Sequence, residues 1–437
     1  MAKRTLFADI AGVLSGNIVA MASALLLSIL LSRTLGPTGY GVYSSLFAVV
    51  SMVMGIALMG MGRSAVYHLG RKVFDESATV SSILLMQLFT GSLSMLAAGI
   101  AYWVIDDNTF EWYWIVLVLC MLPFLVGNYY QGGVFMGKEQ IKRANRLMWL
   151  PTSINLCLSA ILVWGFKLGI TGALVAVLVS TFSVNVNGIL GLVRQFTIRL
   201  IFHKNILRSL VKMGIVYALT TMLLQWNYKV DVLLLKRMVP LSEVGFYSLG
   251  VSITEQLWLL PYAMGVVLMS RTANATNNEQ ILETTARLLR FAFPLALVGG
   301  LVMALLTPFI LPLIFGEKFI PSIQVVQAIL PGIVIFMVFR ILESYFAGIG
   351  KPWISMGFLI PSLVINVGLN LWLIPLFGIL GSAWATNASY LFATLLCVIT
   401  FTRMSGLGLS ELFILKKDDI RLITNHLRNI QKKGKAT

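Results

Sequence analysis

The sequence predicts an all-α polytopic membrane protein with twelve transmembrane helices, arranged as two pseudo-symmetric six-helix lobes around a central cavity. Three observations lead to this fold class. The chain is 58% hydrophobic and only 11% charged, which leaves too few charged residues to cover a water-exposed surface. It contains twelve long apolar stretches, and the second six resemble the first six in sequence.

Each apolar stretch approaches or exceeds the ~20 residues that a helix needs to cross the hydrocarbon core of a bilayer. The first is too long for the core of a signal peptide and no plausible cleavage site follows it, so we expect it to remain as an anchor. The stretches cover residues 10–32, 40–62, 79–104, 113–136, 147–166, 168–192, 213–235, 245–270, 288–315, 322–348, 354–376 and 378–402.

The positive charge of the chain is distributed unevenly between the connections. Of the 33 Lys and Arg residues, 26 lie in, or at the edge of, the N-terminus, the even-numbered connections and the C-terminal tail. Only 5 lie in the odd-numbered connections. This bias places both termini in the cytoplasm. The net charge of +16 therefore reflects membrane topology and contact with anionic lipid headgroups on the cytoplasmic side, and it does not indicate a nucleic-acid partner.

The two halves of the chain share short motifs in the same order. "GPTGYGVYSSL" (36–46) resembles "VPLSEVGFYSL" (239–249), and the segment 136–176 resembles 349–386. The matched residues include Gly41 with Gly245, Asn155 with Asn366, and Gly169-Ile170-x-Gly172 with Gly378-Ile379-x-Gly381.

Each repeat holds six spans and starts on the same side, so we expect two lobes related by an axis along the membrane normal. Residues 1–193 form the predicted N-terminal lobe and 213–403 the C-terminal lobe. A basic amphipathic surface helix is expected over the linker 194–212. The tail 404–437 is predicted to carry a second one on the inner leaflet, over 416–435.

Several functional classes lack their sequence features. None of the three Gly-Lys pairs is followed by Ser or Thr, so the phosphate-binding loop of an ATP-driven transporter is missing. The predicted outer loops reach only about ten residues, too short to build an enzyme site, and we expect no catalytic residue. Cys120, Cys157 and Cys397 have no paired spacing, and no metal site or cofactor is expected.

At "GPTGYGVYSSL", "VDVLLLKRMVPLSEVGFYSLG" (230–250) and "TPFILPLIFGEKFIPSIQVVQAILPGIV" (307–334), the chain resembles a known group. This is the polysaccharide-flippase branch, with the Wzx-type O-antigen flippases, of the multidrug/oligosaccharidyl-lipid/polysaccharide (MOP) superfamily. The resemblance covers residues 1–405. Lipid II flippases of the superfamily carry two further helices, which are not found here.

The resemblance implies an alternating-access protein that moves an undecaprenyl-diphosphate-linked oligosaccharide from the inner to the outer leaflet of the cytoplasmic membrane. It also implies a monomer with the glycan polymerase machinery as a partner, and it leaves coupling to H⁺ or Na⁺ open. The alternative is a cation-coupled multidrug exporter of the same fold.

Two charges lie in the seventh apolar stretch, in "QWNYKVDVLLL" (225–235). Positions i and i+2 point about 200° apart on a helix, so Lys229 and Asp231 need different partners. Lys229 shares a helix face with Gln225. Under the flippase interpretation these two line the cavity and Lys229 binds the diphosphate. Alternatively, the apolar stem of Lys229 stays in the membrane while its ammonium group reaches the outer surface. The resemblance implies a structural role for Asp231, with a donor from the following loop or from Tyr228.

Four further charged residues are candidates. Glu255 lies near the predicted bilayer midplane and could bind the coupling ion, pair with Lys229, or stay protonated in the core. Arg340 and Glu343 are spaced to pair with each other, and Arg340 could instead line the cavity with Glu343 as a second coupling candidate. Arg63 is either the first contact for the diphosphate or an ordinary basic anchor.

Overall fold

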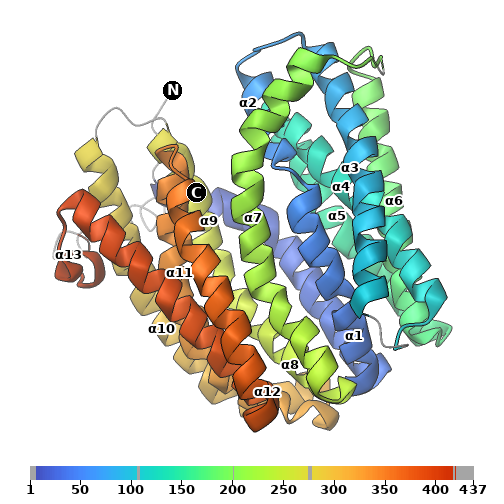
Figure 1. Ribbon diagram of the computed structural model, residues 1–437, viewed down its shortest axis with the longest axis vertical. Coiled ribbons are helices and arrows are strands. Elements are labelled where there is room, and N and C mark those ends of the chain that lie inside the picture. Colours follow the sequence, from blue (N-terminus) through green and yellow to red (C-terminus); the bar gives the residue numbers. More distant parts are fainter. Residues whose placement is uncertain (1–5, 106–108, 200, 274–277, 417–418, 420–437) are drawn as a thin grey trace, which may run out of the picture.

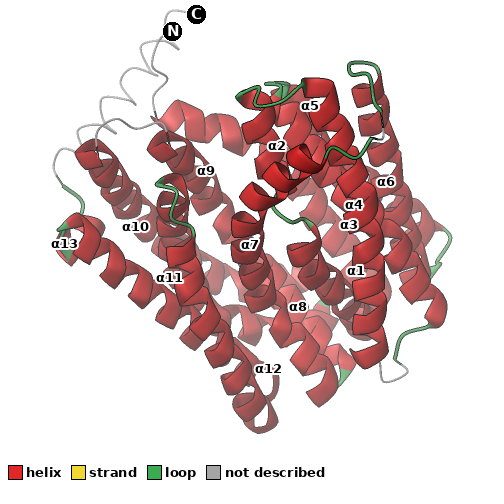
Figure 2. Ribbon diagram, turned by 45° about the horizontal axis from the view of Figure 1, so that its top comes forward, coloured by secondary structure: helices red, strands yellow, loops and turns green. Residues whose placement is uncertain are grey.

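The computed structural model describes residues 6–105, 109–199, 201–273, 278–416 and 419, and every regular element in this part of the chain is a helix (Figure 2). The predicted all-α class is confirmed. The helices are α1 (Leu6–Ala57), α2 (Met61–Gly70), α3 (Glu76–Ile105), α4 (Trp112–Gly137), α5 (Ile141–Ser159), η1 (Ala160–Gly165), α6 (Gly169–Val193), α7 (Lys204–Met238), α8 (Leu241–Thr254), η2 (Glu255–Trp258), α9 (Leu259–Ala273), α10 (Asn278–Phe315), η3 (Glu317–Phe319), α11 (Ser322–Gly348), α12 (Trp353–Ser405) and α13 (Leu409–Phe413).

These helices provide twelve spans. Within the described residues, nine continuous helical segments are long and apolar enough to cross a membrane, and the bent helix α7 is a tenth. Two of the nine, Ile18–Gly70 and Trp353–Ser405, are each 53 residues long, and each contains two spans joined at a glycine. The count of ten therefore becomes twelve, in agreement with the twelve apolar stretches.

The two long segments turn back at residues with a left-handed backbone. Gly36 has φ 67° and Gly378 has φ 57°, a conformation that costs glycine little because it has no Cβ. In each hairpin, a side-chain contact joins the two arms between residues that are 12 positions apart in the chain. The Tyr40 hydroxyl lies 3.1 Å from Oγ of Ser28, and Ser382 donates a hydrogen bond to Oδ1 of Asn370 across 2.7 Å.

The predicted repeat is visible in backbone and side-chain geometry. Gly169, at the start of α6, has φ 58°, matching the 57° of its counterpart Gly378. Asn155 accepts a hydrogen bond from Ser159 across 3.1 Å, and the corresponding Asn366 accepts one from Asn370, also across 3.1 Å. The two halves thus fold alike even where the side chains differ.

The halves converge at one end of the molecule and spread apart at the other (Figure 1). Helix α1 packs against both α7 and α8, and Gly41 and Gly245 allow α1 and α8 to meet at the converging end. The opposite end carries the even-numbered connections, which hold, or have at their edge, 16 Lys and Arg residues against 5 in the odd-numbered connections; we call it the basic end.

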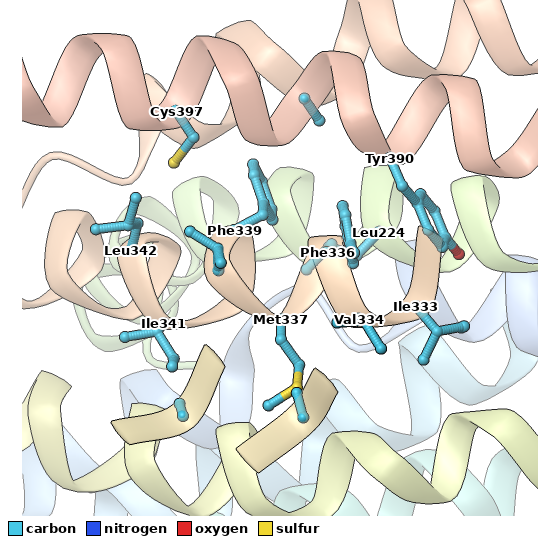
Figure 3. Packing of buried hydrophobic residues seen from close by; sticks show 14 of the residues in the cluster. Leu224, Ile333, Val334, Phe336, Met337, Phe339, Ile341, Leu342, Tyr390 and Cys397 are labelled. Carbon is cyan, nitrogen blue, oxygen red and sulfur yellow. The ribbon is translucent and has the colours of Figure 1, made fainter. Parts of the chain in front are cut away.

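The second half encloses a large aromatic and aliphatic core around α11. Tyr390 of α12 points toward α11, where its ring stacks on Phe336 with 4.2 Å between centroids (Figure 3). Phe336 in turn stacks on Phe339 at 4.8 Å. Such contacts hold helices together inside a bilayer, where dispersion attraction replaces the hydrophobic effect.

Two details differ from the sequence-based expectations, and a third prediction is not tested. The predicted linker helix over 194–212 is wrong, because residues 196–199 and 201–203 are irregular and Lys204 already begins α7. Leu207 and Leu210 are buried against the first half, which favours one long helix over a separate surface helix. The eighth span is interrupted at Glu255, where the 3₁₀ turn η2 separates α8 from α9. The tail helix expected over 416–435 lies outside the described residues, except for Lys416 and Asp419.

Candidate functional site

Lys229 and Glu255 form an ion pair between α7 and η2. Nζ of Lys229 lies 3.4 Å from Oε1 of Glu255, and the two side chains are 27% and 26% exposed. Tyr40 of α1 lies within electrostatic range of both groups. The structure therefore contains the Lys229–Glu255 pair, which was one of the alternatives for Glu255. The pair lies where α1, α7 and the eighth span come together.

The interruption of the eighth span explains how Glu255 reaches this position. Residues 255–258 form a 3₁₀ turn, and short 3₁₀ segments inside a long helix often mark hinges. Broken helices are tolerated in a membrane where the backbone lies inside protein or lines a cavity. Gln225, one turn before Lys229 on α7, packs against Gly55 of α1 and so faces the same junction.

Arg340 and Glu343 lie one turn apart on α11, with 3.9 Å between NH1 and Oε2 and with 21% and 10% of the side chains exposed. Tyr228 lies within electrostatic range of both residues and also of Glu255. Its hydroxyl is buried and has no hydrogen-bond partner among the described residues, so Tyr228 is not the donor to Asp231 that we had considered. The tyrosine is instead within electrostatic range of both ion pairs.

Arg63 belongs to the first half but reaches the second. Its guanidinium lies over the ring of Tyr217 on α7, 5.1 Å from the centroid, in a cation–π contact. Tyr129 of α4 lies within electrostatic range of Arg63 and of Tyr262 on α9. Tyr262 lies within range of Arg340, and both Tyr129 and Tyr262 are 40% exposed.

These side chains lie in a series from one half to the other, in which Arg63 contacts Tyr217 and the remaining members lie within electrostatic range of a neighbour in the series. We call Arg63, Tyr129, Tyr217, Tyr262 and Arg340 the inter-lobe cluster. It combines two guanidinium groups with partly exposed aromatic rings. Guanidinium groups bind phosphate oxygens in bidentate fashion, and flat aromatic faces offer apolar contact surface.

Asp231 lies outside this cluster, in a polar core between α7, α8 and α12. It is 2% exposed and accepts hydrogen bonds from the Tyr247 hydroxyl and, across 2.8 Å, from its neighbour's backbone N–H. Thr386 of α12 lies 3.5 Å away. Tyr247 belongs to the segment after α7 in which a donor was expected.

The polar core continues along α12. Asn227 donates to Ser362 across 3.3 Å and accepts from Ser389 across 3.4 Å, and Asn366 donates to Ser389 across 3.3 Å. These residues were not among the site residues predicted from the sequence. A sequence pattern that could have identified them is a pair of asparagines one turn apart, at 366 and 370, followed by Ser or Thr at 382, 386 and 389. All of these lie on one face of otherwise apolar spans.

Among the described residues, no group of three or more His, Cys, Asp and Glu side chains could hold a metal ion. The side chains at this junction are binding groups: the guanidinium groups of Arg63 and Arg340, the ammonium group of Lys229, and the tyrosine hydroxyls and rings. Such a set can hold a large, partly anionic, partly hydroxylated molecule between the two halves.

The model of a family described as "Polysaccharide biosynthesis protein" matches residues 6–271, more than half of the chain. The chain belongs to this family. The resemblance to the polysaccharide flippases of the MOP superfamily is thereby confirmed. A second model, MatE, matches residues 217–372 of this flippase.

The flippase is also similar to a curated protein from Shigella flexneri named "Putative O-antigen transporter". The two are 22% identical over 402 residues, which cover 86% of this chain and 92% of the relative. The relative's name and the helical fold both point to a transporter rather than an enzyme.

Solved structures share the fold. An inward-facing multidrug-resistance MATE-family transporter of the MOP superfamily superposes with a TM-score of 0.76 at 18% identity, covering 89% of this chain and 95% of the other. A MOP superfamily transporter from Pyrococcus furiosus, described with a binding pocket of reverse polarity, superposes with a TM-score of 0.65 at 17% identity, covering 92% of this chain and 95% of the other.

Proposed function

We propose that this flippase moves an undecaprenyl-diphosphate-linked oligosaccharide from the inner to the outer leaflet of the cytoplasmic membrane. The inter-lobe cluster is the observation that supports this substrate. A diphosphate needs cations, and Arg63 and Arg340 supply one from each half. The pyranose rings need flat apolar faces and hydroxyl partners, which Tyr129, Tyr217 and Tyr262 can provide.

In this proposal the basic end lies in the cytoplasm together with both termini, as the distribution of Lys and Arg favours. Arg63 makes the first contact with the diphosphate. Its exposed side chain is held by Tyr217, and no carboxylate in the described part of the chain pairs with it, so the substrate does not have to break an ion pair there. Arg340 and then Lys229 act deeper in the molecule.

Lys229 is held by Glu255, and this pair gives the transporter a means of coupling. Protonation of Glu255, or binding of Na⁺ to it, would release Lys229 to the diphosphate. Glu343 has the same relationship to Arg340. The carboxylate and the substrate then compete for the same cation, so ion binding and substrate binding assist each other. Asp231, enclosed by its donors, keeps α7, α8 and α12 together.

A cation-coupled multidrug exporter is the second candidate, favoured by the match of the MatE model to residues 217–372. Cationic drugs require a carboxylate that is free to receive them. Here Glu255 and Glu343 each lie beside a cation, and Asp231 is buried at 2% exposure. The charge pattern therefore favours an anionic substrate.

We further propose that the protein acts as a monomer and passes its product to the glycan polymerase machinery. Complementation tests the substrate. In cells lacking their own O-antigen flippase, the wild-type gene is expected to restore surface glycan, and Arg63→Gln to abolish most of it at equal protein level. Arg199→Gln, an exposed arginine outside the cluster, is the matched control. Resistance to cationic dyes without surface glycan would instead identify the exporter.

A further inference from the structure

A second cationic site lies away from the inter-lobe cluster, inside the first half. A cavity of about 280 Å³ opens between α4, α5 and α6 at the basic end. Its lining includes three arginines, Arg143 and Arg146 of α5 and Arg194 at the end of α6. No function assigned so far uses this cavity.

None of these arginines is neutralised within the described part of the chain. Arg143 donates a hydrogen bond to the side-chain amide oxygen of Gln140 across 3.1 Å and lies 5.8 Å from the centroid of the Phe135 ring. No described carboxylate lies within ion-pair distance of Arg143, Arg146 or Arg194. Three guanidinium groups thus share one opening, and an anion would relieve their mutual repulsion.

The cavity changes character with depth. Its interior walls include Leu147, Leu150 and Val184, and Val184 is only 1% exposed. Leu150 lies four residues beyond Arg146 on α5, which corresponds to about 6 Å along the helix axis. The arginines therefore surround the mouth at the basic end, and the part that extends toward the hydrocarbon is lined by Leu147, Leu150 and Val184 together with one polar side chain, Asn187.

We propose that this cavity binds a phosphate-bearing membrane lipid, with the headgroup phosphate among Arg143, Arg146 and Arg194 and the first methylenes of a chain against Leu147, Leu150 and Val184. Guanidinium groups suit a phosphodiester because they donate parallel hydrogen bonds to two of its oxygens. Basic pockets between transmembrane helices on the cytoplasmic side are suited to anionic headgroups. A free phosphate would use the mouth and leave the apolar walls unoccupied.

The test measures lipid binding by the purified full-length protein and does not depend on transport. Phosphatidylglycerol or phosphatidylcholine is added in detergent, and bound lipid is counted by native mass spectrometry while thermal stability is followed in parallel. We expect phosphatidylglycerol to bind and stabilise the wild type, and R143Q/R146Q/R194Q to bind it at least about tenfold more weakly. The triple variant R199Q/K204Q/R208Q removes the same charge from the same end outside the cavity and is expected to bind normally.

Leu150→Phe provides an independent variant, because it fills the half-buried apolar part and leaves all three arginines in place. It too is expected to weaken phosphatidylglycerol binding. Inorganic phosphate and pyrophosphate are tested alone at equal ionic strength. Equal loss in the two triple variants would mean that general surface charge attracts the lipid, and full binding by Leu150→Phe would mean that the cavity holds no chain; each result overturns the proposal. Equal stabilisation by phosphate without lipid overturns it as well.

Discussion

Gly41 of α1 and Gly245 of α8 occupy equivalent positions in the two repeats and pack against each other's helix. A Cβ atom on Gly41 would overlap the carbonyl oxygen of Leu241, and one on Gly245 would overlap the carbonyl oxygen of Pro37. Pro37 and Leu241 each lie four residues before their own glycine. The contact therefore repeats itself about the pseudo-twofold axis, and small residues allow the backbones to meet, as at other close helix crossings in membranes.

This contact is the structural basis of the first prediction. Gly41→Ala or Gly245→Ala should prevent the two helices from closing and shift the population toward a form open at the converging end. A cysteine placed near Pro37 should then react faster with a membrane-impermeant maleimide. Gly357→Ala is the control, because a Cβ there meets nothing within 4 Å. Unchanged labelling in well-folded variants would show that the contact does not act as a gate.

The second prediction concerns Lys229 and Glu255. Lys229→Ala and Glu255→Ala should each reduce glycan export, and the double variant should recover thermal stability relative to either single variant but not export. The pair is about one-quarter exposed, so we expect a stability coupling of about 0.2–1 kcal/mol.

Lys138 and Glu76 form a matched control for this experiment. Their ion pair measures 2.6 Å with 25% and 32% exposure, but it lies in the first half at the basic end. Removing it should give a similar stability coupling with normal export. Normal export by a well-expressed Lys229→Ala protein would leave the lysine as a structural partner of Glu255 only.

The third prediction separates Asp231 from the binding residues. Asp231→Ala should lower the amount of folded protein, because the buried Tyr247 hydroxyl loses its acceptor, at a cost of about 1–3 kcal/mol. Tyr247→Phe should be milder, since Asp231 keeps the hydrogen bond from its neighbour's backbone N–H. Folded yield after detergent extraction measures both. A normally folded but inactive Asp231→Ala protein would assign the carboxylate to transport.

The fourth prediction concerns the tail, where Asp419 holds Arg290 of α10. Arg290 is fully buried, and its Nε donates to Asp419 across 2.6 Å; its other nitrogens bond Glu283 and the carbonyl oxygen of Glu411. Burial of Asp419 alone would raise its pKa, but the hydrogen bonds from Arg290 and from the backbone N–H of Lys416 lower the pKa overall.

A carboxylate with a lowered pKa stabilises the fold above its ordinary value near 4, and this stabilisation is lost as the pH falls through the lowered value. Asp419→Asn should therefore reduce the melting temperature by a constant amount between about pH 5 and pH 8. The difference should shrink only in stronger acid. Glu139→Gln, at an exposed loop residue, should have no effect. A difference that disappears near neutral pH would contradict the assigned interaction.

The sequence was sufficient for the spans and the repeat because both follow from local properties. Apolar length predicts a span, and Gly169 and Gly378 keep a left-handed backbone in both halves. The charged residues were also found individually, because a charge inside an apolar stretch stands out. The pairing of Arg340 with Glu343 follows from their i, i+3 spacing, and the pair of Lys229 with Glu255 was one of the alternatives considered. The contact of Arg63 with Tyr217 depends on helix packing that no spacing in the chain encodes.

The linker and the polar core also depend on packing between helices that are distant in the sequence. Leu207 and Leu210 give residues 204–212 the pattern of an amphipathic surface helix, and only the neighbouring half of the molecule reveals that they are buried at the start of α7. Asn366, Thr386 and Ser389 are uncharged, so each is unremarkable in a membrane span. They form a polar core only because the fold brings them close to Asp231, which is more than a hundred residues away in the chain.

The inter-lobe cluster is the proposed binding site for the diphosphate, and transport by the reconstituted protein measures its role. Purified protein in liposomes, with an undecaprenyl-diphosphate-linked oligosaccharide in both leaflets, is mixed with an impermeant glycosidase, and the rate at which the protected glycan becomes accessible is measured. We predict a rate well above that of protein-free liposomes, reduced at least about tenfold by Arg63→Gln and by Arg340→Gln combined with Glu343→Gln, and unchanged by Arg199→Gln. A wild-type rate equal to that of protein-free liposomes, or an equal rate in all variants, would contradict the account.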